Sequence, residues 1–298
     1  MKTSTILIIT VVITVIVSAF CIWVMPSKQD FAESNVSWNG LREWRGTVDI
    51  DDIALDALPA LPGGHMLVVI PHVPYRESEI LAIKNFISQG GTLVLLDDYG
   101  YGNTILGYIG LDARFSNKTM YDPLFCYKNP VLPRITNFSS AFEESGIRSI
   151  VLNHATSLTG IAYGNVLAWS SGDSFLDNND NSQNDAGDSK GPFPIAAQLM
   201  YGKGTIILFS DPSIMINSML GIEDNSAMVK YLMQYSAERP APVLFDYDHL
   251  EQDTIDKSKA GLLTVRELMS TPYPLLSIVA IIFVLAYHYG FKKGELFG

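Results

Sequence analysis

The strongest constraint on the fold is a pair of short apolar segments with a helical pattern between them. Met66–Ile70 and Thr92–Leu96 are nearly continuous apolar runs, which are typical of strands that a parallel sheet buries on both faces. Between them, residues 77–87 carry apolar side chains at helical spacing, and Gly90-Gly91 ends that helix. A strand, a helix and a strand in this order predict a βαβ unit.

The same alternation continues along the chain. Further strands are predicted at residues 149–152, 166–169, 204–209 and 242–246, and further helices at residues 103–111 and 225–235. Strands interleaved with helices predict an α/β fold with an open, mostly parallel sheet.

The ligand site of such a sheet lies beyond the carboxyl ends of its strands. The polar residues at or shortly after these ends are therefore the candidates for lining a ligand crevice: Asp97, Asp98, Ser170, Asp211, Asn217 and Asp246. A strand-end aspartate is also a common helix cap, so a capping role is the alternative for each of these carboxylates.

Two long runs without charge lie towards the ends of the chain. Residues 6–25 carry no charged side chain, and this length is sufficient to cross the hydrocarbon core of a bilayer. Residues 269–291 carry no Asp, Glu, Lys or Arg and are followed by two lysines. These patterns predict two transmembrane helices. A cleaved signal peptide is the alternative for the first run, and a buried core helix is the alternative for the second.

Two spans would place both termini on one side of the membrane, and the lysines near both ends favour the cytoplasm for that side. An external domain would be open to N-glycosylation at three Asn-x-Ser/Thr triplets, which begin at Asn35, Asn117 and Asn137. The predicted organisation is a transmembrane anchor at residues 1–25, a linker at 26–45, an extracytoplasmic α/β domain at 46–250, a connector at 251–270, a transmembrane helix at 271–291 and a cytoplasmic tail at 292–298.

Composition excludes several classes of function. The chain has 20 Lys and Arg against 31 Asp and Glu, a net charge of −11, and no basic patch set apart, so nucleic acid is not an expected partner. Its two cysteines cannot build a disulfide framework or a thiolate zinc site. The sequence also lacks a nucleophile elbow of the Gly-x-Ser/Cys-x-Gly type. No residue is therefore assigned a catalytic role, and a protein that is not an enzyme is favoured.

The most polar stretch of the chain, residues 172–191, carries oxygen ligands at alternate positions, as a calcium loop requires. Part of this stretch matches the opening of an EF-hand loop, but Ser182 replaces the glycine of that motif. A solvated loop without metal is the alternative, and no other cofactor is indicated. The candidate Ca²⁺ ligands are Asp173, Asp177, Asn179, Asn181 and Asp185.

Two segments resemble a known family. Residues 86–98 (FISQGGTLVLLDD) and 201–217 (YGKGTIILFSDPSIMIN) resemble a microbial family of membrane-anchored proteins that contain a domain of unknown function with a class I glutamine-amidotransferase-like fold. The likeness covers residues 45–250 and implies a flavodoxin-like sheet. It also implies, in many relatives, a gene neighbourhood with AAA-type ATPases or transporter components. It implies no established activity.

These observations lead to one expected function and two alternatives. We expect a two-span membrane protein whose external domain is a non-catalytic binding or scaffolding subunit of a membrane assembly, with the lipid bilayer and other membrane proteins as partners. One alternative is a metal-assisted hydrolase of an external glycan or other polymer, which would hold a cation at Asp211 and Asp246. The other is a ligand-binding component of a transporter, which would have a closed apolar pocket.

Overall fold

The chain divides into two units, here called the terminal unit, Met1–Ser27 with Gln252–Gly298, and the central unit, Lys28–Glu251. The structure is a computed structural model that describes residues 3–32, 34–60, 65–143, 145–234, 242–251, 253–270, 276–277, 279–280, 283–284 and 287.

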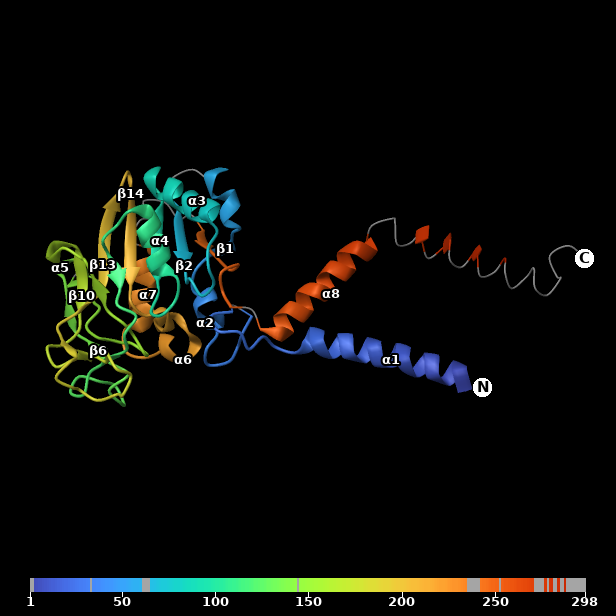
Figure 1. Ribbon diagram of the computed structural model, residues 1–298, viewed down its shortest axis with the longest axis horizontal. Coiled ribbons are helices and arrows are strands. Elements are labelled where there is room, and N and C mark those ends of the chain that lie inside the picture. The colour runs from blue at the N-terminus through green and yellow to red at the C-terminus, as the bar shows by residue number, and fades with distance from the viewer. Residues whose placement is uncertain are drawn as a thin grey trace, which may run out of the picture. The chain divides into compact units, whose positions relative to one another are not determined.

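The central unit is built on a mixed sheet (Figure 1). Its strands, in spatial order, are β1 (Ile50–Asp52), β15 (Val243–Phe245), β2 (Met66–Val69), β3 (Thr92–Leu96), β14 (Gly204–Phe209), β13 (Pro194–Tyr201), β10 (Val166–Trp169) and β7 (Asn137–Phe138). Neighbours from β1 to β14 are parallel, whereas β14, β13, β10 and β7 pair in antiparallel fashion.

Helices cover both faces of this sheet (Figure 1). Side chains alternate along a strand, so Leu93 and Leu95 enter one core while Val94 and Leu96 enter the other. The first core packs against α3 (Glu77–Ser88) and α4 (Gly102–Ile109). The second packs against α2 (Arg42–Arg45), α6 (Asn217–Leu220) and α7 (Asn225–Gln234). The sheet is therefore buried on both faces, as the apolar strands predicted.

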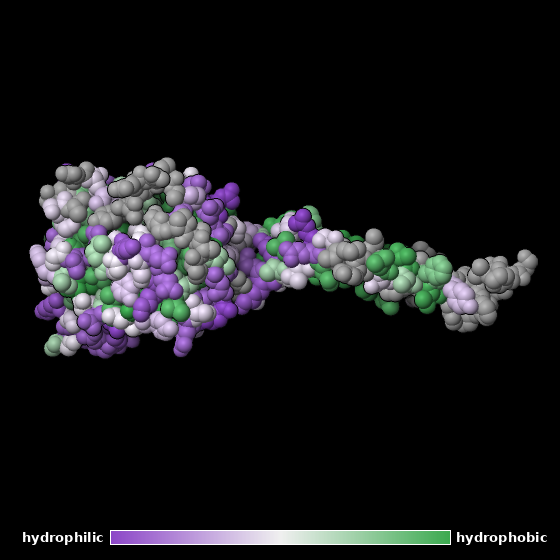
Figure 2. Space-filling model, turned by 90° about the horizontal axis from the view of Figure 1, so that it is seen from above, coloured by the Kyte–Doolittle hydropathy of each residue, from purple (hydrophilic) through white to green (hydrophobic). Residues whose placement is uncertain are grey.

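Short elements complete the central unit. They are η1 (Leu55–Ala60), β4 (Arg114–Phe115), β5 (Met120–Tyr121), β6 (Arg134–Ile135), α5 (Ser140–Glu143), β8 (Ile150–Val151), β9 (Leu158–Thr159), η2 (Tyr163–Asn165), β11 (Phe175–Leu176), β12 (Ser189–Lys190) and η3 (Pro212–Met215). On the face of the molecule seen in Figure 2, hydrophilic side chains of this unit are spread among smaller hydrophobic areas.

The sheet differs from the predicted one in its second half. The sequence did not predict β13, and this strand joins β14 through a turn at Gly202 and Lys203. Gly202 has a φ of 59°, a left-handed conformation that glycine adopts without steric cost. Because so short a turn reverses the chain at once, β13 and β14 pair in antiparallel fashion and the sheet is mixed.

Of the linker predicted at residues 26–45, residues 28–45 belong to the central unit. Leu41 and Trp44 are buried in the core that faces α6 and α7. Trp44 packs edge-on against Phe245 of β15, with ring centroids 5.5 Å apart.

The terminal unit corrects the predicted membrane topology. It contains α1 (Thr3–Val24) and α8 (Thr254–Ser270), and no helix among the described residues is long and apolar enough to cross a membrane. The prediction of a two-span protein with flanking transmembrane helices, an extracytoplasmic domain and cytoplasmic termini is therefore wrong. It rested on stretches without charge, and the absence of charge does not by itself make a helix a membrane span. Most of the second predicted span, residues 271–291, lies outside the described residues.

The turn between β13 and β14 gives a test of the packing. A Cβ at Gly204 would lie 2.2 Å from the carbonyl oxygens of both Gly91 and Ile87. We expect Gly204→Ala to lower the free energy of unfolding in urea by about 1–3 kcal/mol, because overpacking a dense core forces the backbone apart. Gly172→Ala is the matched control, since a Cβ there meets nothing within 4 Å. Equal stability of the two variants would contradict this packing.

Candidate functional site

The carboxyl ends of β2, β3 and β14 bring three polar side chains into line. Counting forward along the parallel register of these strands places His72, Asp98 and Asp211 beside one another. Leu96 and Phe209 stand two residues earlier and belong to the core that faces α6 and α7. Because side chains alternate along a strand, the three polar residues share this face of the sheet.

Two cavities adjoin at this edge, and we name them together the carboxyl-edge crevice because His72 and Asp98 line both. The first, of about 220 Å³, is lined by Asp30, Phe31, Trp38, Asn39, His72, Asp98, Asn153, His154, Ser213 and Ile216. The second, of about 290 Å³, is lined by His72, Asp98, Tyr99, Gly100, Tyr101 and Glu251.

The crevice is acidic. Asp30, Asp98 and Glu251 line it, and no lysine or arginine of the described residues does so. Burial lowers the pKa of His72 from 6.5, although the carboxylates of Asp30 and Glu251 act in the opposite direction. His72 is therefore neutral at pH 7 and supplies no positive charge. Its ring meets that of Phe31 edge-on, with centroids 4.9 Å apart.

Asp98 is the acidic side chain common to both cavities. Its Oδ1 accepts the backbone N–H of Tyr99 at 2.7 Å. Burial raises the pKa of Asp98 to about 6, so the carboxylate is charged at neutral pH and gains its proton in mild acid.

A second carboxyl group, that of Asp211, lies behind the crevice wall and holds two of its loops. It is fully buried and accepts the backbone N–H groups of Asn153 and Ser213, each at 2.7 Å. Burial raises the pKa of Asp211 to about 8, and the charge of Asp98 acts in the same direction. Asp211 therefore positions residues of the crevice but is not itself in its lining.

Asp97 has the same role for the loop that follows β3. Its two carboxylate oxygens accept the N–H groups of Gly100 and Gly102, each at 2.7 Å. Burial raises the pKa of Asp97 to about 7, and those hydrogen bonds only partly oppose the effect. A Cβ at Gly102 would lie 2.5 Å from Asp97 Oδ2, so glycine permits this close approach of backbone and carboxylate.

His154 enters the crevice from a strained loop. Its φ of 55° is left-handed, which a residue with a Cβ adopts at a cost of about 1 kcal/mol or more. The hydroxyl of Tyr99 donates to the carbonyl oxygen of His154 at 2.8 Å and holds this conformation. Nδ1 of His154 lies 2.8 Å from Oδ1 of Asn153.

Of the six predicted crevice residues, only Asp98 lines the crevice. Ser170 Oγ lies 2.7 Å from Ser174 Oγ and accepts the N–H of Phe193 at 2.8 Å, so its hydroxyl is engaged elsewhere. Asp246 accepts a hydrogen bond from the Tyr75 hydroxyl at 2.8 Å, and its Oδ1 lies 2.9 Å from Nδ1 of His249.

Asn217 fastens the segment that follows Lys28. Its Oδ1 accepts the N–H of Glu43 at 2.9 Å, while its Nδ2 donates to the carbonyl oxygens of Asn35 and Ser37 at 3.1 and 2.6 Å. These contacts use both ends of the amide, so Asn217 holds the segment that brings Trp38 to the crevice.

Sequence reasoning missed His72, His154, Asn153 and Trp38. For His72 a signal was present, because it follows the predicted strand Met66–Ile70 by two residues, as Asp98 follows the predicted strand Thr92–Leu96. Trp38 was hidden by the interpretation of its segment as a linker, and no pattern in the sequence singles out the loop of Asn153 and His154.

The candidate calcium loop directs its carboxylates towards N–H groups. Asp177 accepts backbone N–H groups of Asn179, Asn181 and Ser182, and these hydrogen bonds outweigh burial and lower its pKa. Asp185 accepts the side-chain amides of Asn179 and Asn181 at 3.0 and 2.6 Å, which lowers its pKa. Among the described residues, no group of three or more His, Cys, Asp or Glu could hold a metal ion. Asp173 is exposed in the same loop.

The predicted glycosylation sites differ in exposure. Asn117 and Asn137 are exposed, whereas Asn35 is fully buried. The amide nitrogen of Asn35 donates to the carbonyl oxygen of Gln29 and to Oδ1 of Asn39, both at 2.9 Å.

The fold and the crevice define a mixed α/β domain with a ligand-sized hollow at the carboxyl edge of its parallel strands. Residues 33–233 match the family described as Domain of unknown function (DUF4350), so the chain belongs to that family. This confirms the expectation of an uncharacterised family. The membrane anchoring and the glutamine-amidotransferase-like fold that the resemblance implied are not supported.

Solved structures show only distant likeness. The N-terminal domain of mmIFT52 has 14% identity, covering 68% of this chain and 90% of that chain, with a TM-score of 0.49. A cytoplasmic protein from Salmonella typhimurium LT2 has 14% identity, 66% and 84% coverage, and a TM-score of 0.37. For the beta-galactosidase from Bacillus circulans sp. alkalophilus the values are 12%, 59% and 23%, and 0.36, so this chain spans less than a quarter of that enzyme. Comparison with curated proteins found no match. Because these TM-scores are all below 0.5, the likenesses support no conclusion about function.

The three buried carboxyl groups predict how stability varies with pH. Folding raises the pKa values of Asp97, Asp98 and Asp211 from 3.8 to about 7, 6 and 8. A raised carboxyl pKa means that the native state binds the proton more tightly, so its stabilising effect is complete below 3.8 and is lost as pH rises through the folded value. We expect the free energy of unfolding to fall from pH 5 to pH 8, and Asp211→Asn to flatten this slope.

Denaturant unfolding at several pH values measures the effect. Asp51→Asn is the control, because Asp51 is an exposed residue of β1. A slope unchanged in Asp211→Asn, or equally flattened in Asp51→Asn, would contradict the assignment.

Proposed function

We propose that the protein is a non-catalytic binding domain whose carboxyl-edge crevice takes a small ligand group that carries an organic cation, such as an alkylammonium or a guanidinium. The observation that carries the proposal is the crevice lining: the carboxylates of Asp30, Asp98 and Glu251 stand there without a lysine or arginine from the described residues. A cationic group would supply the missing charge.

The surroundings of the crevice favour a cation further. Burial raises the pKa of Asp97 and Asp211 behind its wall to about 7 and 8, and a bound cation would stabilise the charged form of both carboxyl groups. Trp38 lines the first cavity with 66% of its surface exposed, so its ring is available to a ligand. A cation over an indole face gains about 0.5–1 kcal/mol at exposed sites. Anionic ligands would meet repulsion from the same groups.

The contacts in the crevice support binding rather than catalysis. Ser213 lies with His72 and His154 in the first cavity, but no hydrogen bond among the described residues joins its hydroxyl to either imidazole. Nucleophilic catalysis needs such a pair, in which the base accepts the hydroxyl proton. The predicted metal-assisted hydrolase also gains no specific support, because Asp211 and Asp246 are each engaged by protein donors.

The transporter alternative predicted a closed apolar pocket, whereas this crevice is acidic and partly lined by an exposed tryptophan. A role in assembling partner proteins stays a prediction from the sequence.

A matched ligand series tests the proposal. We expect n-butylguanidinium and n-butylammonium to shift the NMR signals of His72 and Trp38 in the full-length chain, with butanamide and butyrate producing no saturable shift. Asp98→Asn should weaken n-butylguanidinium binding about tenfold or more, because a hydrogen bond to a charged group contributes about 1.5–3 kcal/mol. Asp51→Asn should bind as the wild type does. Binding of butanamide or butyrate as tight as that of the cations would contradict the proposal.

Affinity should also depend on the proton at Asp98. The pKa of this carboxyl is raised to about 6, so the negative charge that attracts the ligand is lost as pH falls through that value. We expect n-butylguanidinium to bind more weakly at pH 5 than at pH 7 and to release protons on binding at pH 6. Titration calorimetry in two buffers of different ionisation enthalpy measures the release, and uptake of protons would count against the role of Asp98.

A further inference from the structure

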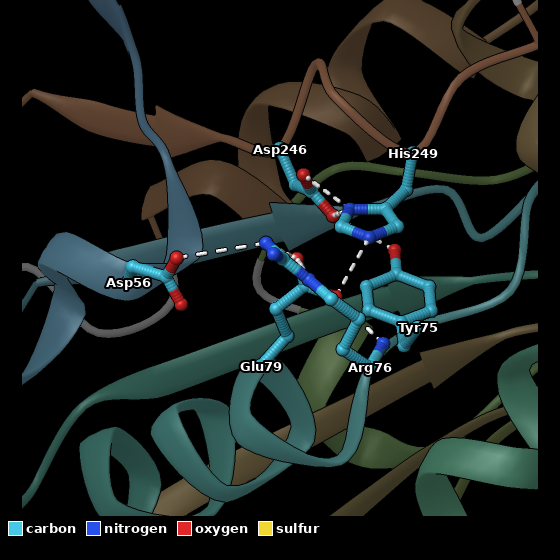
Figure 3. Close-up of polar contacts among 6 residues, drawn as sticks. All are labelled: Asp56, Tyr75, Arg76, Glu79, Asp246 and His249. Atoms are coloured by element: carbon cyan, nitrogen blue, oxygen red, sulfur yellow. Dashed lines mark hydrogen bonds and ion pairs between the residues drawn. The ribbon is translucent and has the colours of Figure 1, made fainter.

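A second polar cluster lies on the opposite face of the sheet from Asp98 and is not part of the crevice lining. His249 follows β15 and is drawn with its polar neighbours in Figure 3. Its side chain is only 6% exposed. Nδ1 of its imidazole lies 2.9 Å from Asp246, and Nε2 lies 3.3 Å from Glu79 Oε2. The ring of Tyr75 stacks on it, with centroids 3.7 Å apart and an interplanar angle of 10°.

The cluster joins two parts of the fold. Asp246 and His249 come from the segment after β15, whereas Tyr75 and Arg76 directly precede α3 and Glu79 lies in its first turn (Figure 3). Asp246 is fully buried and Glu79 is nearly so. The imidazole thus lies between the carboxylates of Asp246 and Glu79, one from each part of the fold.

Both hydrogen bonds of the ring can form only when His249 is protonated. Both ring nitrogens face carboxylates, so an imidazolium can donate to both, whereas a neutral ring presents a lone pair to one of them. Burial alone would lower the pKa of His249, but the hydrogen bond and charge of Asp246 and the charge of Glu79 outweigh it, and the pKa is raised above 6.5.

The neighbouring groups hold the carboxylates in place. Burial raises the pKa of Glu79, but hydrogen bonds from Arg76 and the charge of His249 outweigh this effect, and the net pKa is lowered. Burial and nearby carboxylates raise the pKa of Tyr75 well above 10, so its hydroxyl keeps the proton that it donates to Asp246. The titratable and charged groups around the imidazole are Tyr75, Arg76, Glu79, Asp246 and Asp248, with Asp97 from the end of β3 and Asp56 from η1.

The backbone of the same segment reaches the crevice. The carbonyl oxygen of His249 accepts the N–H groups of His72 and Val73, at 3.0 and 3.1 Å. Glu251, two residues further on, lines the second cavity together with His72. A movement of the 246–251 segment would therefore displace Glu251 and break the backbone hydrogen bond that holds His72, and both residues line the crevice.

We propose that protonated His249 is a latch that holds the 246–251 segment against the start of α3, and that loss of its proton to solvent releases the segment and disorders the crevice wall. Its effect on ligand binding rests on the proposed function of the crevice, whereas the release of the segment does not. The stabilising contribution is complete below pH 6.5, the unperturbed value, and is lost as pH rises through the raised value.

The release is measured without ligand. In the full-length chain, NMR follows the His249 ring from pH 6 to pH 9, and amide hydrogen exchange follows the N–H groups of His72 and Val73. We expect protection of these amides, corrected for intrinsic exchange, to fall at least tenfold across the titration of His249. His249→Gln should give the low protection already at pH 6 and lack the step that coincides with the titration of His249, and His65→Gln, which alters a histidine before β2, should behave as wild type.

Two results would overturn the latch. One is titration of His249 with unchanged protection of His72 and Val73, and the other is the same step in protection retained in His249→Gln. If the variant does not fold, the wild-type titration decides the matter by whether the step in protection coincides with the titration of the His249 ring.

Binding of n-butylguanidinium separates the latch from the proposed function. We expect affinity to fall on the acid side, through Asp98, and again on the alkaline side, through His249. His249→Gln should remove only the alkaline change, and His65→Gln should keep it. No binding at any pH would refute the proposed function while the exchange data still judge the latch. Binding without an alkaline change, together with a positive exchange result, would refute the coupling to the crevice.

Discussion

The central unit depends on burying carboxyl groups at the carboxyl edge of its parallel strands. Asp97, Asp98 and Asp211 are brought there by the register of β3 with β14, and burial raises the pKa of each. Such groups oppose folding when charged, yet Asp97 and Asp211 hold loops by accepting the backbone N–H groups of Gly100 and Asn153. Asp97 and Asp211 therefore organise the crevice wall, while Asp98, with a pKa raised only to about 6, carries negative charge in the crevice at neutral pH.

The sequence predicted the parallel half of the sheet because its signals are local. Each buried strand and the periodicity of α3 can be recognised within a few residues, and β2, α3 and β3 form where they were expected. Strand β13 could not be recognised in this way, since it follows a polar stretch and is fixed by pairing on both sides with β14 and β10. Whether neighbouring strands are parallel or antiparallel depends on which segments pair, and the hydrophobic periodicity of a single segment does not predict its partner.

The candidate site was predictable only in part for the same reason. The rule that ligands bind at carboxyl ends of strands found Asp98, but it could not separate Asp98 from Asp97, its neighbour on the opposite face of the strand. The crevice also needs Trp38 and His154, which reach it through Asn217 and Asp211, far away in sequence. The two uncharged terminal runs led to a wrong prediction for a different reason. Each run was interpreted as a membrane span because it carries no charge, but no helix among the described residues is long and apolar enough to cross a membrane.

Alternation along β3 links the two polar clusters of the central unit. Asp98 enters the crevice, whereas Asp97, one residue earlier, faces the side of Tyr75 and helps to raise the pKa of its hydroxyl. On the other edge of β2, the segment after β15 contributes His249 to one cluster and Glu251 to the crevice. The chain also enters the central unit at Lys28, two residues before Asp30 of the crevice, and leaves it at Glu251. The two polar clusters are therefore connected by two short segments, the 97–98 pair and residues 246–251, each of which contributes to both clusters.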